Sequence, residues 1–218
     1  DAMTVGGVLL MVLAAGAGLT AGVAGALVLD VRGRAAGALA ALVIAAASVI
    51  APALALSLVD GLTQWPWLVG QVVVAVVLVA AALRLGRRPP ALPRASDLAT
   101  AARAHPAVAV LAGCAAIAMA FQLVGAVLVA PQNWDAMSYH LSKVAYWLQF
   151  DSATQFPDGT WRQLYTPPNA ELLQAWTLEM LGTDRAVQLV QWVAGIACGL
   201  AVFAGARELG ARPEHAVF

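Results

Sequence analysis

Five long apolar runs constrain this chain more than any other feature of its sequence. They occupy residues 4–29, 35–59, 65–85, 106–130 and 186–206, and each is long enough for the roughly 20 residues that a helix needs to cross a bilayer core. Only 11% of the 218 residues are charged and 61% are hydrophobic. A soluble domain carries about 25% charged residues, so this composition cannot cover a water-facing surface. The sequence therefore predicts an all-α, polytopic bundle of about five transmembrane helices.

Charge is balanced overall but unevenly placed between the runs. The 12 basic and 12 acidic residues cancel, which gives no reason to expect a nucleic-acid partner. The basic residues gather after the first, third and fifth runs, at Arg32, Arg34, Arg84, Arg87, Arg88, Arg94, Arg103, Arg207 and Arg212. Because basic connectors stay in the cytoplasm, we expect the chain to begin outside and end inside, with residues 131–185 on the external face.

The Pro-rich basic link at 84–103 divides the chain. We interpret it as a solvated loop held near anionic headgroups. Residues 1–105 would then form a three-span module with its cytoplasmic linker. Residues 106–218 would form a second module, in which one span leads into the external segment and another follows it. The two cysteines lie inside apolar runs, where they suggest neither a disulfide nor a metal site.

The external segment is long enough to carry its own structure. We expect a first helix, capped by Asn133 or Asp135 and ending near Gln149, with its polar side chains on one face. Met137, Leu141, Val144 and Leu148 share another face, which predicts a helix lying in the membrane interface. An irregular stretch with Pro and Gly turn signals follows. A second helix is expected at 169–181, ended by Gly182.

The first of these helices carries the chain's best candidates for chemistry. Asp135 lies at the mouth of the fourth span, where a carboxylate is costly unless paired, hydrated or used. His140 and Lys143 follow roughly 7 and 12 Å further along, a spacing that suits one extended ligand better than a shared metal. Arg162 offers a phosphate contact, and Tyr165 offers a flat face to a sugar ring.

Each candidate also has an ordinary structural interpretation. Asp135 can serve only as an N-cap, and Lys143 can extend toward lipid headgroups. His140 can be a satisfied interfacial residue, and Arg162 can pair with Asp158. On composition and spacing alone, these alternatives stay open.

Three separated blocks resemble a known family. NWDAMSYHLSKVAYWLQ, then RQLYTPPNAELL, then GTDRAVQLVQW resemble the first large external loop of GT-C type membrane glycosyltransferases. The likeness is greatest to the bacterial protein O-mannosyltransferase-like proteins of glycosyltransferase family 39. It covers about a quarter of the chain, and the first hundred residues carry no such signature. GT-C enzymes usually have eight or more spans, so we expect a chain with five to be an N-terminal portion of such a protein.

The resemblance implies an inverting transfer of a sugar from a polyprenyl-phosphate donor at the external or periplasmic face of the bacterial cytoplasmic membrane. It implies Asp135 as catalytic base. Alongside this base, we expect the substrate to be bound by His140, Lys143, Arg162, Tyr165 and Trp134. The donor is a substrate, so no cofactor or metal is assigned. The sequence departs from the family's pattern at Ala136, where relatives often carry a second acid, and at Thr166, where they often carry Lys.

Two other classes of function compete with the enzyme. One is a non-catalytic transmembrane subunit that keeps a GT-C-derived loop and binds lipid or a membrane protein partner. The other is a transporter or channel, which the scarcity of ionisable residues within the spans disfavours.

Overall fold

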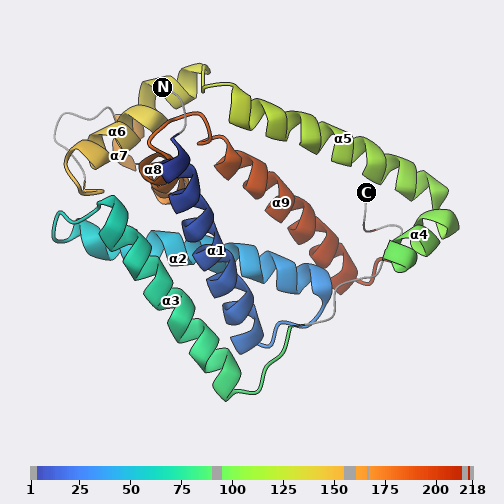
Figure 1. Cartoon of the computed structure of the whole chain (residues 1–218). Helices are drawn as coiled ribbons and strands as arrows, with labels where there is room; N and C mark the ends of the chain where they lie inside the picture. The colour runs from blue at the N-terminus through green and yellow to red at the C-terminus, as the bar shows by residue number, and fades with distance from the viewer. Residues whose placement is uncertain (1–3, 90–94, 155–160, 166, 213–215, 217–218) are drawn as a thin grey trace.

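The computed structural model describes residues 4–89, 95–154, 161–165, 167–212 and 216, and every regular element among them is helical (Figure 1). Five helices are long and apolar enough to cross a membrane: α1 (Val5–Val28), α2 (Arg34–Ser57), α3 (Gln64–Arg84), α5 (Pro106–Leu128) and α9 (Leu189–Glu208). The predicted all-α bundle with five spans is confirmed.

The first three spans pack closely because small residues line their contacts. A methyl group at Gly22 of α1 would overlap the backbone carbonyl oxygen of Ala41 in α2. A methyl group at Gly70 of α3 would come within 2.9 Å of the Pro52 side chain in α2. Small residues allow such close backbone approach between helices in lipid. We call α1, α2 and α3 the three-span unit.

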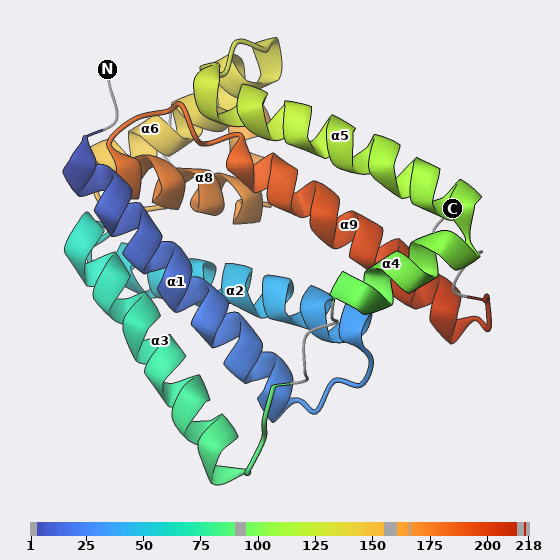
Figure 2. The ribbon, with the colours of Figure 1, turned by 45° about the vertical axis from the view of Figure 1, so that its right-hand side comes forward.

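Helices α5 and α9 lie together (Figures 1 and 2), and α9 also packs against α2 of the three-span unit. The indole Nε1 of Trp192 donates to the carbonyl of Met119 at 2.8 Å, and Gln188 Nε2 donates to the carbonyl of Val129 at 2.9 Å. No residue in the most apolar stretch of either helix is buried. The two spans are therefore joined to each other between the middle of α5 and its end near residue 130, and most of the apolar surface of α5 is uncovered.

We call residues 131–185 the interspan segment, and its described residues form a largely helical layer at one end of the bundle (Figure 2). It contains a π-helical turn η1 (Ala136–His140), α6 (Leu141–Gln149), α7 (Trp161–Tyr165) and α8 (Asn169–Leu181). The predicted helix at 169–181 is confirmed, and Gly182 ends it with a φ of 69°.

Two short helices lie where the sequence was interpreted as irregular. α4 (Ala95–Ala104) falls within the linker that we expected to be a loop, and α7 falls within the expected irregular stretch. Both follow a proline-containing turn signal, but neither contains Gly or Pro itself, and α4 is rich in Ala, the strongest helix former. Proline marked a helix boundary in each case rather than an absence of helix.

The interspan segment is anchored on the three-span unit. Ser152 Oγ donates to the carbonyl of Ser57 at 2.8 Å, and the backbone N–H of Ala153 donates to Ser57 Oγ at 2.9 Å. Gln64 Nε2 donates to the carbonyl of Glu179 at 2.9 Å. One buried cluster also joins the two parts, with Trp67, Leu68 and Ala14 from the spans and Val144, Trp147, Leu172 and Met180 from the interspan segment.

This packing corrects one expectation. The apolar side of α6 was predicted to face lipid at the membrane interface. Val144 and Trp147 are instead buried in the shared core with α8. An amphipathic pattern predicts an apolar environment for one face, but lipid and protein satisfy it equally well.

Candidate functional site

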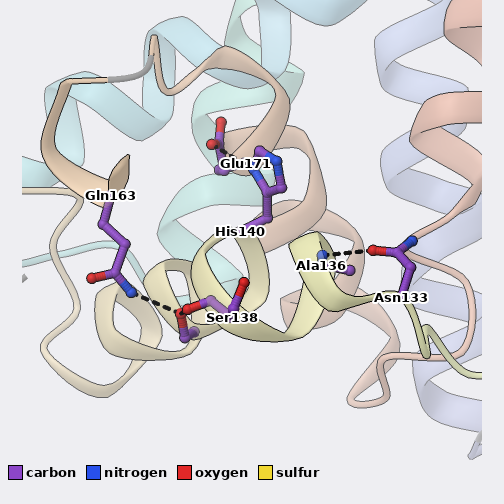
Figure 3. Close-up of polar contacts among 7 residues, drawn as sticks. Asn133, Ala136, Ser138, His140, Gln163 and Glu171 are labelled. Carbon is purple, nitrogen blue, oxygen red and sulfur yellow. Dashed lines mark hydrogen bonds and ion pairs between the residues drawn. The ribbon is translucent and has the colours of Figure 1, made fainter. Parts of the chain in front are cut away.

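Asn133, not Asp135, caps the helix that begins the interspan segment. Its Oδ1 accepts a hydrogen bond from the backbone N–H of Ala136 at 2.7 Å (Figure 3). Asp135 already has helical dihedrals, with φ −65° and ψ −44°, and its side chain makes no capping hydrogen bond. The N-cap interpretation of Asp135 is therefore wrong, and its exposed carboxylate has no structural role at the helix terminus.

The turn that follows Asp135 is wider than an α-helical turn. The backbone N–H of Leu141 donates to the carbonyl of Ala136, five residues back, which defines a π turn. In an α-helix, residues five apart lie about 140° apart around the axis. In a π turn, the fifth residue returns to nearly the same side. This turn therefore brings Asp135 and His140 to one side, and both line the same cavity.

The π turn also explains why the predicted apolar face fails at its start. Met137, assigned to that face, is 57% exposed, whereas Val144 further along is fully buried. One extra residue in the turn rotates everything before it relative to everything after it.

The cavity has a volume of about 880 Å³ and lies between η1, α8, α5 and α9. This volume is within the range of small-molecule sites. Its lining combines apolar, aromatic and amide side chains with Asp135 and His140, and includes Phe121, Gln122, Ala126, Pro131, Asn133, Trp134, Leu141, Gln174, Val187, Gln188, Gln191 and Trp192. Two of its walls are membrane spans. A ligand here could keep an apolar tail in the bilayer and present a polar group to Asp135.

A buried carboxylate holds His140. Glu171, in the first turn of α8, is 2% exposed, and its Oε1 lies 2.9 Å from Nδ1 of His140 (Figure 3). Because a carboxylate can only accept, this contact assigns the proton to Nδ1 and leaves Nε2 as the other polar atom of the ring. Among the residues that the structure describes, no group of three His, Cys, Asp or Glu side chains is placed to hold a metal ion.

Lys143 does not extend toward headgroups, so that interpretation is wrong. It is 5% exposed, and its Nζ lies 5.0 Å from the centre of the Trp147 ring. Burial lowers the pKa of Lys143, and the nearby Glu171 carboxylate partly opposes this shift. Lys143 packs inside the interspan segment and is not among the residues that line the cavity.

Arg162 is also outside the described lining of the cavity. Its guanidinium lies 5.8 Å from the centre of the Tyr139 ring and 5.6 Å from that of Trp161. Its suggested partner Asp158, and the side chain of Tyr165, fall outside the described residues. Of the six sequence-predicted site residues, the structure thus brings together Asp135, His140 and Trp134.

Sequence reasoning missed Glu171 and the amide side chains of the cavity. Glu171 is separated from His140 by 31 positions, so no local spacing reveals the pair. Its one signal was an acidic residue three positions after Pro168, within the second of the three family-like blocks.

No protein-family model matches this chain, and no curated protein or solved structure is significantly similar to it.

Proposed function

We propose that this chain belongs to a membrane glycosyltransferase that moves a sugar from a polyprenyl-phosphate donor to an acceptor hydroxyl, with Asp135 as general base. One observation carries the proposal. The Asp135 carboxylate is exposed, has no capping role, and lines a cavity two of whose walls are membrane spans. That arrangement suits a reaction between a lipid-borne donor and an acceptor arriving from water. The three sequence blocks that resemble GT-C enzymes lend further support.

In the proposed reaction, the acceptor hydroxyl gives its proton to Asp135 while its oxygen attacks the anomeric carbon. The bond from that carbon to the phosphate oxygen breaks, and the lipid phosphate leaves with the electron pair. General-base catalysis of this kind typically contributes about 10²–10⁴-fold. Neither Lys143 nor Arg162 lines the cavity. Among the lining residues, His140 is held at Nδ1 by Glu171 and can donate from Nε2 to the leaving phosphate as an imidazolium, while the amide side chains supply neutral donors.

The test replaces Asp135 with Asn, which keeps the size of the side chain and removes the base. We expect sugar transfer in reconstituted membranes to fall by about 10²–10⁴-fold, with unchanged expression and unfolding temperature. Asp184→Asn is the matched control, because Asp184 is also an exposed acid of the interspan segment but does not line the cavity. Full transfer by Asp135→Asn would end the assignment.

The proposed setting is the bacterial cytoplasmic membrane, with the interspan segment on the periplasmic face. The distribution of arginines supports this orientation. We expect a membrane-impermeant reagent to label a cysteine introduced at the exposed Gln149 in intact spheroplasts.

A second candidate is a non-catalytic subunit of a larger membrane complex. The uncovered surfaces of α5 and α9 favour it, because they offer room for partner helices. Co-purification with other membrane proteins in fixed stoichiometry, without any sugar transfer by the complex, would favour the subunit over the enzyme.

A further inference from the structure

We propose that a groove between α1 and α3 binds one anionic phospholipid of the surrounding membrane. The two helices lie side by side (Figures 1 and 2), and the groove between them has a volume of about 420 Å³. It lies toward the C-terminal ends of both helices, whereas the first residue of α3, Gln64, contacts the interspan segment at the other end. The groove is separate from the cavity at Asp135, and the inference is independent of the proposed function.

Small side chains hollow out the groove. Ala24 of α1 and Ala82 of α3 line it and are each 5% exposed, whereas Leu19 and Leu83 beside them are 57% and 71% exposed. Apart from Thr20 and Arg87, the described lining is apolar. The eight residues from position 19 to position 27 rise about 12 Å along the helix, slightly less than half of a hydrocarbon core that is roughly 30 Å thick. The groove therefore matches an acyl chain of one leaflet.

Two similar helix ends build the polar end of the groove. After α1, Asp30 has a φ of 54°, and the N–H of the next residue donates to the carbonyl of Ala26 at 3.3 Å. After α3, Gly86 has a φ of 64°, and the N–H of Arg87 donates to the carbonyl of Ala82 at 3.0 Å. Both helices thus end in a left-handed cap that turns the chain back. These turns bring Nη1 of Arg87 to 2.8 Å from Oδ1 of Asp30.

Positive charge exceeds negative charge at this end. The stretches 30–34 and 84–88 carry five arginines and one aspartate, a net formal charge of +4. Arg87 remains 38% exposed beside Asp30, and a guanidinium has five N–H donors, so one carboxylate oxygen does not use them all. The other four arginines are exposed: Arg32, Arg34, Arg84 and Arg88. Basic pockets between membrane helices on the cytoplasmic side bind anionic headgroups, and the distribution of arginines favours that side for this end.

The two parts of the groove together select a class of lipid. One acyl chain lies against the apolar lining, and the phosphate lies at the helix ends beside Arg87. A zwitterionic lipid fills the groove equally well, but its cationic headgroup meets the excess of arginines, and like charges repel. An inorganic phosphate makes no contact with the apolar lining. An anionic phospholipid satisfies both parts.

The experiment compares two lipids with identical acyl chains, phosphatidylglycerol and phosphatidylcholine. Native mass spectrometry of the full chain released from detergent micelles measures the affinity for the first bound lipid. We expect phosphatidylglycerol to bind at least about fivefold more tightly. Arg87→Gln should remove about fivefold of this preference, as expected for one arginine near an anionic headgroup. Asp30→Asn breaks the same ion pair but keeps the arginine, and Asn tolerates the positive φ, so this variant should retain or increase the preference.

A second pair of variants tests the apolar part of the groove. Thr20→Phe fills the groove without changing a charge and should weaken the binding of both lipids by about fourfold or more, the effect of one methylene group left unburied. Val76→Phe is the matched control, because Val76 is 61% exposed on α3 but does not line the groove.

Three outcomes would overturn the inference. They are equal affinity for the two lipids, equal loss of preference in Arg87→Gln and Asp30→Asn, and equal effects of Thr20→Phe and Val76→Phe. The last would mean that lipid adsorbs to the helix surface without entering the groove. Sugar transfer is not measured in this experiment, so the proposed function stands or falls separately.

Discussion

Glu171 is the most deeply buried acid that the structure describes near the cavity, and it interacts with two basic side chains. It contacts His140 directly and interacts electrostatically with Lys143. A buried carboxylate of this kind is tolerated because partners are built around it, and removing it leaves those partners in an apolar setting. The contact between Glu171 and Nδ1 thus fixes the orientation of the His140 ring.

We expect Glu171→Leu to destabilise the protein by about 1–3 kcal/mol, because it strands the Nδ1–H of His140. Glu171→Gln keeps an acceptor at that position and should cost less. Thermal unfolding in detergent, followed by tryptophan fluorescence, measures both variants. Equal losses for Leu and Gln would show that the contact with His140 does not contribute.

Glu179 predicts a pH dependence. Burial raises its pKa above the usual 4.5; a hydrogen bond from the Gln64 backbone opposes the shift, and the negative charge of Asp151 adds to it. A raised folded-state pKa means that the folded protein binds the proton more tightly than the unfolded chain. The associated stability is present below pH 4.5 and is lost as pH rises through the folded-state pKa.

Glu179→Gln has no proton to lose there. Its stability relative to the native chain should therefore increase across the pH window that begins near 4.5 and extends to the raised pKa, and be constant outside it. Unfolding temperatures measured from about pH 4 to about pH 7 test this. Parallel curves for the two proteins would contradict it.

At the scale of elements, the π turn of η1 sets which residues face the cavity. Deleting Met137 leaves Asp135 and His140 four positions apart, which an ordinary α-helix places about 40° apart on one face. Inserting an alanine after Met137 separates them by six positions and turns one of them away.

We therefore expect the deletion to retain sugar transfer and the insertion to reduce it by about 100-fold, the cost of a misplaced reacting group. Both variants change the chain length by one residue at the same exposed site, so each controls for the other. Loss of transfer in the deletion alone would mean that the π geometry itself is required.

The elements differ in how far the sequence could predict them. The five spans were predictable because each apolar run exceeds what a bilayer needs, and α8 was predictable because Gly182 ends it. The π turn was not predictable, because one extra residue disturbs the helical spacing and only makes the amphipathic pattern look weaker. Lys143 was misassigned for a related reason, because burial depends on what packs over a residue rather than on its type.

The site divides in the same way. Asp135, His140 and Trp134 lie in one short stretch, and a single helix brings them to one cavity. The amides come from α5, α8 and α9, and only tertiary packing brings these helices together. Sequence patterns reveal residues that one helix brings together, but they do not reveal residues that meet only when separate helices pack.

At the scale of the whole molecule, the question is whether lipid or another protein covers the surfaces of α5 and α9. Cys114 on α5 and Cys198 on α9 are both exposed. If lipid covers these helices, a lipid-soluble maleimide should label both thiols in native membranes, while a charged, impermeant reagent labels neither. Cys114→Ser and Cys198→Ser assign the two positions.

Protection from the lipid-soluble reagent in native membranes, followed by labelling after purification in detergent, would instead indicate a protein partner. That outcome favours the subunit alternative.

The walls of the cavity differ in how they are anchored to the rest of the molecule. The wall formed by η1 and α8 belongs to the layer that is hydrogen-bonded and packed onto the three-span unit. The wall formed by α5 is hydrogen-bonded to the α9 region near Met119 and Val129, and no residue in the most apolar stretch of α5 is buried. We therefore expect the neighbours of α5 in the membrane, whether lipid or a partner helix, to act as a mechanical component of the site that influences how wide the cavity stands open.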